Sequence, residues 1–538
     1  MNYEIKDGVG IIPEGTEIVE EGVFQYCTDM TSIVIPDSVK EIDPYAFLHC
    51  ERLASIVFPN SLKKIWHDTF MRCWSLKNVV FPNSLTFIGS GAFEECSSLT
   101  SIVIPDSVKA IGSDAFCACS GLKSIVVSEG NTEYDSRDNC NAIIETATNK
   151  LIAGCQNTTI PNSVTEIDDR AFENCKGLTS IFIPDSVKKI GNGAFYGCKD
   201  LTSIVVSEGN TEYDSRGNCN AIIETATNKL IVGCRNTIIP DSVVEIEDDA
   251  FMNCEGLTSI IIPDSVKKIG NGTFWGCTGV TSIVVSEGNT EYDSRGNCNA
   301  IIETATNKLI VGCRNTIIPD SVVEIEDHVF MNCEGLTSII IPDSVKKIGN
   351  GAFDGCTSLT SIIVSEGNEM YDSRNNCNAI MEKESNKLLL GCKNTVIPDS
   401  VTIIGNGAFL ACKALTSIVI PNSVKVIGEE AFADCTSLEK VTLPSGIQKI
   451  GVKIFYKCTA LTSIVIPDSV KVIGGAAFAG CTSLETVALP SGIQKIGDFL
   501  FYNCTALKTI NVPPQEGDYY RKLLPKELHP LIKELPLE

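Results

Sequence analysis

The chain has 538 residues, of which 43 are Lys or Arg and 67 are Asp or Glu, giving a formal net charge of −24. This charge excludes the basic surface that a nucleic-acid backbone requires, so we expect no nucleic-acid partner. No window holds the roughly 18 consecutive apolar residues of a membrane-spanning helix, so we expect no membrane span.

One repeat runs through nearly the whole chain. A proline preceded by β-branched residues recurs from Pro13 to Pro513 at intervals of 23 or 56 residues. A phenylalanine lies eleven residues, and a cysteine fourteen residues, after each of the first sixteen of these prolines. When the same side-chain type recurs at the same position of every repeat, the copies stack on one another in a solenoid, whose single units cannot fold alone. We therefore expect one solenoid over residues 1–513.

The segment before each proline predicts a short strand. In residues 99–104, Ile102 and Ile104 alternate with Ser101 and Val103, which predicts that the isoleucines point inward and the other two side chains outward. The proline ends the strand because it has no N–H to donate. Stacked strands would form one long, mainly parallel sheet, and the chain would return through irregular or single-turn helical segments.

The outward slot, two residues before the proline, is rich in β-branched side chains. A continuous apolar stripe of this kind is larger than monomers usually expose, so it is a candidate surface for a protein partner. Cover by other segments of the chain, or by self-association, is the alternative. The candidate residues are Val103, Phe182, Val205, Ile261, Val284 and Ile340.

Each 56-residue interval holds 33 additional residues, near 128–160, 207–239, 286–318 and 365–397. In the first, two β-rich runs around a polar turn predict a hairpin. A turn centred on Ala147 and Thr148 would place Ile144 opposite Leu151 and Cys140 opposite Cys155. A slip of one residue would separate the two cysteines.

Each insert also carries a tyrosine followed by Asp-Ser-Arg. Tyrosine and arginine often anchor interfaces, and four copies would allow multivalent attachment. Alternatively, the tyrosine only holds the insert against the neighbouring turn. The residues are Tyr134, Tyr213, Tyr292 and Tyr371, with Arg137, Arg216, Arg295 and Arg374.

The repeat stops at Pro513, and residues 514–538 predict short, proline-broken helices that cap the last turn. Along the whole chain we find no catalytic arrangement, since His49, His67, His328 and His529 are scattered. Cys117 and Cys119 form the only close cysteine pair, without the second pair of a zinc site. We therefore expect no enzyme, no metal and no cofactor, and cysteines that pack as free thiols.

The unit Ile-Pro-Asp-Ser-Val-x-x-Ile-Gly-x-x-Ala-Phe-x-x-Cys-x-x-Leu-x-x-Ile resembles the 23-residue BspA-like leucine-rich repeat, over about residues 10–513. The resemblance implies a right-handed leucine-rich-repeat coil and a non-enzymatic, adhesin-like role. The implied partner is a protein of the host extracellular matrix or of another microbe's surface. The family implies a secreted or cell-surface protein. Residues 1–8 show no secretory signal, so an intracellular protein-interaction scaffold is the alternative.

Overall fold

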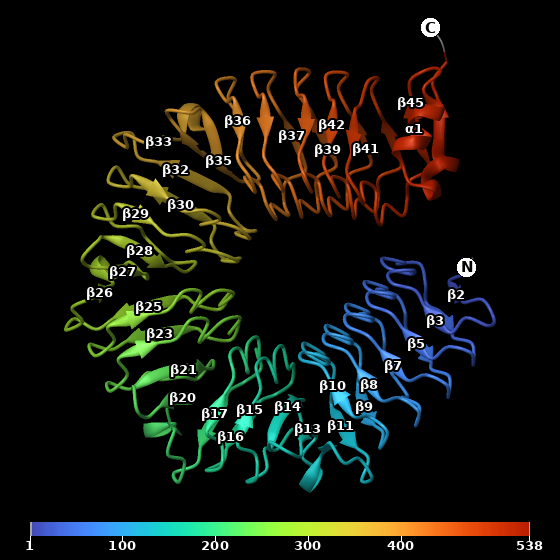
Figure 1. Ribbon diagram of the computed structural model, residues 1–538. Coiled ribbons are helices and arrows are strands. Elements are labelled where there is room, and N and C mark those ends of the chain that lie inside the picture. The colour runs from blue at the N-terminus through green and yellow to red at the C-terminus, as the bar shows by residue number, and fades with distance from the viewer. Residues whose placement is uncertain (1–2, 537–538) are drawn as a thin grey trace. The chain divides into compact units, whose positions relative to one another are not determined.

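The computed structural model describes residues 3–536, which divide into two compact units between Gly279 and Val280. Each unit is a β-solenoid of turns of about 23 residues with little helix (Figure 1). A turn holds two short strands, one just before the proline and one that begins five residues after it. Strands of each kind stack in parallel on their copies, so each unit has two ladders instead of one.

In the first unit, Val103 lies opposite Val126 in the first ladder, and Glu41 lies opposite Lys64 in the second. The strand β1 (Glu4–Lys6) pairs antiparallel with β2 at the start of the chain. The first ladder contains β2 (Val9–Ile11), β4 (Ser32–Val34), β6 (Ser55–Val57), β9 (Ser101–Ile104), β11 (Ser124–Val127), β16 (Ser180–Ile183), β18 (Ser203–Val206) and β23 (Ser259–Ile262). The second contains β3 (Ile18–Val19), β5 (Glu41–Ile42), β7 (Lys64–Ile65), β8 (Phe87–Ile88), β10 (Ala110–Ile111), β15 (Glu166–Ile167), β17 (Lys189–Ile190), β22 (Glu245–Ile246) and β24 (Lys268–Ile269).

The second unit repeats the arrangement, with Ile340 opposite Ile363 in its first ladder. That ladder contains β25 (Ser282–Val285), β30 (Ser338–Ile341), β32 (Ser361–Val364), β37 (Ser417–Val419), β39 (Lys440–Thr442), β41 (Ser463–Val465), β43 (Thr486–Ala488) and β45 (Thr509–Val512). The second contains β29 (Glu324–Ile325), β31 (Lys347–Ile348), β36 (Ile403–Ile404), β38 (Val426–Ile427), β40 (Lys449–Ile450), β42 (Val472–Ile473) and β44 (Lys495–Ile496).

Each insert adds three strands and a short 3-10 turn. In the first, β12 pairs antiparallel with β13, and β13 pairs antiparallel with β14. The elements are β12 (Tyr134–Asp135), η1 (Arg137–Asn139), β13 (Ala142–Glu145) and β14 (Lys150–Gly154) in the first insert; β19 (Tyr213–Asp214), η2 (Arg216–Asn218), β20 (Ala221–Glu224) and β21 (Lys229–Gly233) in the second; β26 (Tyr292–Asp293), η3 (Arg295–Asn297), β27 (Ile301–Glu303) and β28 (Lys308–Val311) in the third; and β33 (Tyr371–Asp372), η4 (Arg374–Asn376), β34 (Ala379–Glu382) and β35 (Lys387–Gly391) in the fourth.

The register of the first insert agrees with the expected pairing only near its turn. Ile144 lies opposite Leu151, but an irregularity between Ile143 and Ile144 shifts the strands by one residue. Beyond it, Ala142 pairs with Gly154, a register that is one residue away from a pairing of Cys140 with Cys155. The slip that would separate the two cysteines is therefore the arrangement in this structure.

The expectation of one long sheet was wrong. Among the described residues of the first unit, β9 and β11 form a two-stranded sheet that ends at the insert, and the first ladder resumes at β16. The second ladder is interrupted as well, because β10 ends one sheet and the next sheet begins within the insert, where β14 pairs in parallel with β15. An insert therefore supplies the strand on which the second ladder resumes and leaves a gap in the first ladder.

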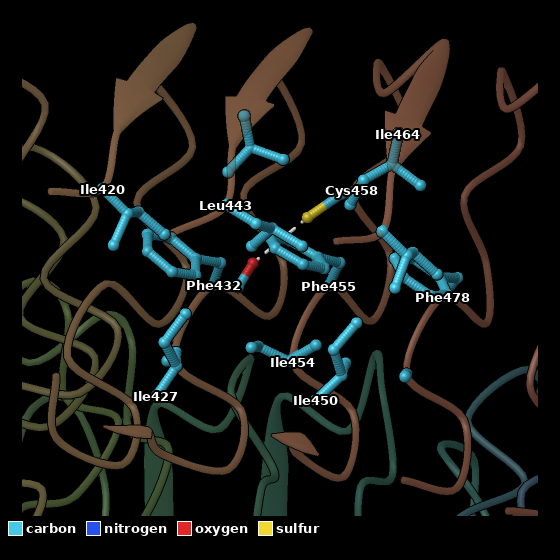
Figure 2. Packing of buried hydrophobic residues seen from close by; sticks show 14 of the residues in the cluster. Ile420, Ile427, Phe432, Leu443, Ile450, Ile454, Phe455, Cys458, Ile464 and Phe478 are labelled. Carbon is cyan, nitrogen blue, oxygen red and sulfur yellow. Dashed lines mark hydrogen bonds between the residues drawn. The ribbon is translucent and has the colours of Figure 1, made fainter. Parts of the chain in front are cut away.

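The core of each unit is a column of stacked phenylalanine rings. Neighbouring rings lie nearly parallel, with ring centroids 5.0 Å apart for Phe47 and Phe70. The centroids of Phe432 and Phe455, which Figure 2 shows, are 5.6 Å apart. Isoleucine and leucine side chains from both ladders surround the column. Substituting a fully buried phenylalanine by alanine usually costs about 3–5 kcal/mol, so each ring is a major contribution to its turn.

A glycine ends this column at each insert. A Cβ atom on Gly154 would lie 2.1 Å from the ring of Phe172, the first phenylalanine after the insert. The ring therefore packs directly on the main chain of β14. The same relation holds between Gly233 and Phe251, and between Gly391 and Phe409.

The last turn is covered by residues 517–534. The helix α1 (Gly517–Leu523) and the 3-10 helix η5 (Lys526–Leu531) lead to β46 (Ile532–Glu534), which pairs in parallel with β45. Tyr520 in α1 is fully buried, and its hydroxyl donates a hydrogen bond to the carbonyl oxygen of Pro490. This segment therefore supplies the apolar contacts that a further turn would have made.

Candidate functional site

The first ladder presents an exposed column of β-branched and aromatic side chains. In β9, Ile102 and Ile104 are buried, whereas the side chain between them, Val103, is 52% exposed. The same alternation exposes each of the other outward residues, because successive side chains of a strand point to opposite faces. The exposed members are Val103, Phe182, Val205 and Ile261 in the first unit, and Val284 and Ile340 in the second.

Strand pairing sets these side chains directly beside one another. Val103 lies opposite Val126, and Phe182 lies opposite Val205. A column of exposed serines runs on the same face, since Ser101 and Ser180 lie two residues before Val103 and Phe182. The surface thus combines a narrow apolar line with hydroxyl groups, and it contains no formal charge in these strands.

Three further members of the column occur where an insert completes a turn. Ile238 is 75% exposed, and Ile317 and Val396 are exposed to a similar degree. Our sequence-based set did not include them. The spacing of the repeat would have identified them, because each lies two residues before its proline, Pro240, Pro319 or Pro398.

The insert tyrosines lie in the core. Tyr134 is only 5% exposed, and its hydroxyl accepts a hydrogen bond from the main-chain N–H of Ile111, 2.9 Å away in the preceding turn. Tyr213 and Tyr371 make the same contact with Ile190 and Ile348. Burial raises the pKa of Tyr134. Tyr292 is buried to a similar degree.

The role of holding the insert against the neighbouring turn, one of the two interpretations of these tyrosines, explains this geometry. A partner cannot contact the rings in this arrangement.

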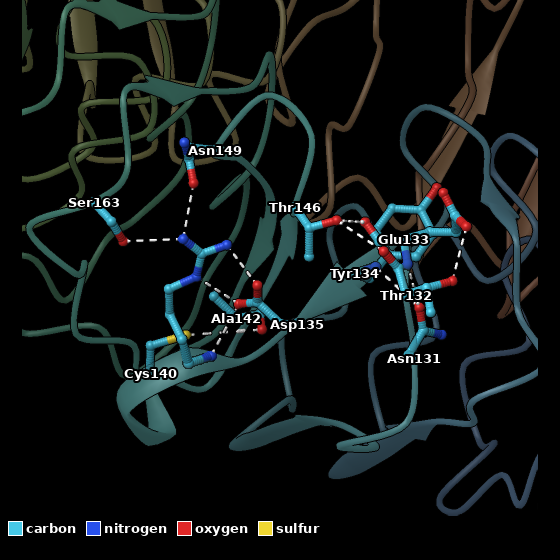
Figure 3. Close-up of polar contacts among 11 residues, drawn as sticks. Asn131, Thr132, Glu133, Tyr134, Asp135, Cys140, Ala142, Thr146, Asn149 and Ser163 are labelled. Carbon is cyan, nitrogen blue, oxygen red and sulfur yellow. Dashed lines mark hydrogen bonds and ion pairs between the residues drawn. The ribbon is translucent and has the colours of Figure 1, made fainter.

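The insert arginines are only partly exposed and are engaged within the insert. The Nε atom of Arg137 donates to Asp135 at 2.7 Å, and Nη1 donates to Asn149 at 2.8 Å and to Ser163 at 3.2 Å (Figure 3). The hydrogen bond that Arg137 donates to Asp135 raises the pKa of Arg137. Arg216, Arg295 and Arg374 repeat these contacts. Each guanidinium therefore joins η1 or its equivalent to the following turn.

A buried asparagine is the polar centre of each insert. The side chain of Asn131 donates to the carbonyl oxygens of Pro105 and Val108, at 2.8 and 3.0 Å. Its Oδ1 atom accepts from the main-chain N–H groups of Glu133 and Tyr134, both at 2.9 Å (Figure 3). Asn210 and Asn368 make the same four bonds. Sequence reasoning missed them, although Glu-Gly-Asn recurs in every insert.

Among the described residues no two cysteines are joined by a disulfide, and most of the cysteines are buried. Within an uninterrupted run of turns, each ladder thiol donates a hydrogen bond to the carbonyl oxygen of the phenylalanine one turn earlier, as Cys50 does to Phe24 at 3.1 Å. Burial raises the pKa of Cys198, which makes this bond to Phe172, to about 12. In the first insert, Cys155 donates to the carbonyl oxygen of Asn141. The thiols thus serve as small core side chains with a donor.

Within residues 3–536, no cluster of three or more His, Cys, Asp and Glu side chains is placed to hold a metal ion. In the same residues, every helix is too short or too polar to cross a membrane.

The comparisons with known proteins agree with the repeat. The model of the BspA type leucine-rich repeat region matches residues 16–144, 139–229, 218–308, 310–382 and 402–519. A search of the curated proteins found no match.

Several solved structures are similar to the chain. A leucine-rich cell surface protein from Faecalibacterium prausnitzii is 28% identical, with 72% of this chain and 95% of that one covered and a TM-score of 0.43. The pneumococcal vaccine antigen PcpA is 22% identical over 65% of this chain and 73% of that one, with a TM-score of 0.37. A leucine-rich repeat protein from T. pallidum is 27% identical over 42% of this chain and 92% of that one, with a TM-score of 0.26.

Proposed function

The chain belongs to the BspA-type leucine-rich repeat family, and we propose that it is an adhesin-like protein that binds another protein through the exposed column of its first ladder. Members of this family are typically not enzymes. The observation that carries the proposal is the repeated exposure of Val, Ile and Phe side chains on paired strands, such as Val103 beside Val126 in one sheet and Phe182 beside Val205 in another.

Such a surface favours a protein partner for a physical reason. When a partner removes these exposed apolar side chains from water, the complex is stabilised by about 25 cal/mol per Å² of apolar area buried. The flanking serines, such as Ser101 and Ser180, offer hydroxyl groups that can bond to polar groups of the partner. Side chains held in strands lose little conformational entropy on binding, because the ladder already fixes them.

A set of substitutions that the repeat itself tolerates tests the proposal. Thr442 occupies the outward slot in β39, so threonine fits this position in a strand. A variant that combines Val103→Thr, Val126→Thr, Phe182→Thr and Val205→Thr should bind at least tenfold more weakly to purified extracellular matrix proteins and to bacterial cells that the unsubstituted chain captures.

The control carries Val244→Thr and Val426→Thr, which change exposed valines outside the column. It should bind like the unsubstituted chain. Equal binding by the column variant, with an unchanged melting temperature, would contradict the proposal, as would failure of the full chain to bind any of these probes.

A further inference from the structure

A corner of each turn, thirteen residues after the proline, has a backbone conformation that suits few residues. Its φ angle is positive in every turn, a region that favours glycine and asparagine. Asn or Gly occupies half of these corners, as at Asn174 and Gly197. The other half depart from this rule, and the first four of these follow one another with large side chains, with φ near 60° at Tyr26, His49, Arg72 and Glu95. Large side chains in this conformation are unfavourable, and they cluster at functional sites.

These four side chains touch one another in sequence. The rings of Tyr26 and His49 stack with centroids 5.1 Å apart. Arg72 connects its two neighbours, because Nη1 lies 3.1 Å from Nε2 of His49 and Nε lies 3.0 Å from Oε1 of Glu95. An arginine can only donate, so Nε2 of His49 is the acceptor in this contact. The result is one connected line across four turns.

Trp74 lies beside this line and also departs from the repeat. Its ring meets His49 edge-on, with centroids 6.0 Å apart, and 37% of the residue is exposed. In the other turns this position, fifteen residues after the proline, holds a small or charged polar side chain. Those residues are Thr28, Glu51, Ser97, Ser120, Lys176, Lys199, Glu255, Thr278, Glu334, Thr357, Lys413, Thr436, Thr459, Thr482 and Thr505. The core therefore does not require an indole here.

Trp74 forms one wall of a cleft of about 670 Å³ within the first unit. Hydroxyl and amide side chains line the cleft, among them Ser97, Ser120, Asn174 and Asn253. The volume is in the range of small-molecule sites, and the combination of an aromatic surface with a few polar groups is typical of them.

The charged groups of the cleft largely neutralise one another. Glu95 pairs with Arg72 at 3.0 Å, and Glu255 pairs with Lys199 at 3.5 Å. A site whose carboxylates are already paired offers little attraction to a cation, and the lysines give only a weak preference for an anion. Neutral hydroxyl groups, which both donate and accept hydrogen bonds, match the serine and asparagine side chains best.

We propose that this cleft binds a neutral oligosaccharide, with the apolar face of one sugar ring against the indole of Trp74 and hydroxyl groups on the serines and asparagines. The aromatic ring presents a negative face to the C–H groups of a sugar. The site lies at the turn corners of the first unit, not on the first ladder, so the inference is independent of the proposed protein-binding column.

Calorimetric titration of the full chain with cellohexaose, laminarihexaose and chitohexaose tests the inference. We expect at least one of them to bind with a Kd below 1 mM, on the scale at which weak ligands are measurable, and to change tryptophan fluorescence. Trp74→Thr introduces the threonine that other turns carry at this position, as at Thr459 and Thr482. It should weaken binding at least tenfold, and Trp74→Phe should weaken binding less.

Lys413→Thr, at the equivalent position in the second unit, is the control and should leave binding unchanged. The inference is overturned if none of the three sugars binds, or if Trp74→Thr binds as tightly as the unsubstituted chain while both melt at the same temperature.

Discussion

The thiol of Cys458 donates a hydrogen bond to the main-chain carbonyl oxygen of Phe432, 3.2 Å away and one turn earlier in the solenoid (Figure 2). The same bond joins Cys435 to Phe409 and Cys481 to Phe455. The carbonyl oxygen of Phe432 also accepts the main-chain N–H of Cys435 at 3.4 Å, and the thiol adds a second donor from a side chain small enough not to disturb the stack. This contact gives a physical reason for the cysteine in each turn that follows another regular turn.

Cys458→Ala should therefore destabilise the protein more than the same substitution at Cys412. Cys412 follows an insert, and residue 386, one turn earlier by the same offset, is an asparagine instead of a phenylalanine. Both changes remove a buried sulfur, but only the first removes a hydrogen bond to a phenylalanine carbonyl. We expect a difference of about 0.5–1.5 kcal/mol in urea unfolding. Equal losses would show that the thiol contributes only its volume.

The buried thiols should also make stability depend on alkaline pH. Burial raises the pKa of Cys333 and Cys412 to about 12, whereas a free thiol titrates near 8.5. Unfolded thiols therefore lose protons before folded ones, and the stabilisation is complete below pH of about 8.5 and is lost as the pH rises towards 12. Unfolding midpoints in urea should fall steadily between pH 8.5 and 11.

The same burial predicts little reaction of the native thiols with a disulfide reagent at pH 8, and reaction of all 25 after denaturation. The measurement counts released thiolate before and after adding guanidinium. Rapid reaction of most thiols in the native protein would contradict it.

The sequence was sufficient to predict the repeating turn, and the structure confirms a leucine-rich-repeat β-solenoid of about 23 residues a turn. The exposure of Val103 followed from simple alternation within one strand. The second ladder was not predicted, because a two-residue strand such as β5 is too short to show any alternation. The register of the inserts was also not predicted, since the alternation of side chains along the strands does not reveal the irregularity between Ile143 and Ile144.

Residue type alone was a poor guide to the inserts. Tyrosine is common at interfaces, but Tyr134 is buried because its hydroxyl finds a donor at Ile111 in the preceding turn. The role of Asn131 was not predicted, because asparagine is usual in turns, yet its side chain makes hydrogen bonds with four main-chain groups. Both roles depend on a neighbouring turn that comes into contact only in the folded chain.

Asn131→Asp should loosen the first insert. A carboxylate cannot donate to the carbonyl oxygens of Pro105 and Val108. The change therefore places a charged acceptor against these two carbonyl acceptors in a buried site. We expect a loss of about 2–4 kcal/mol, within the range for a broken buried network, and faster hydrogen exchange over residues 131–149. Asn60→Asp is the matched control, because Asn60 is exposed and Asp37 holds the same place one turn earlier. Similar exchange in both variants would contradict the role of Asn131.

Gly154→Ala tests how the phenylalanine column ends. Its new Cβ atom would lie 2.1 Å from the ring of Phe172, so the ring or β14 must move. Forcing a methyl group into a packed core costs about 1–3 kcal/mol. Thermal unfolding followed by far-ultraviolet circular dichroism measures the loss. Gly446→Ala, whose Cβ would meet only the end of Lys425 at 3.6 Å, should change stability by less than about 0.5 kcal/mol.

A double variant separates this clash from an effect of glycine on the flexibility of the unfolded chain. Phe172→Leu alone should destabilise the protein, because it shortens a stack in which Phe172 and Phe195 lie 5.1 Å apart. If the clash is the cause, Gly154→Ala together with Phe172→Leu should cost less than the sum of the two single changes, because leucine leaves room for the methyl group. Additive losses would place the effect of Gly154 in the main chain, independent of the ring.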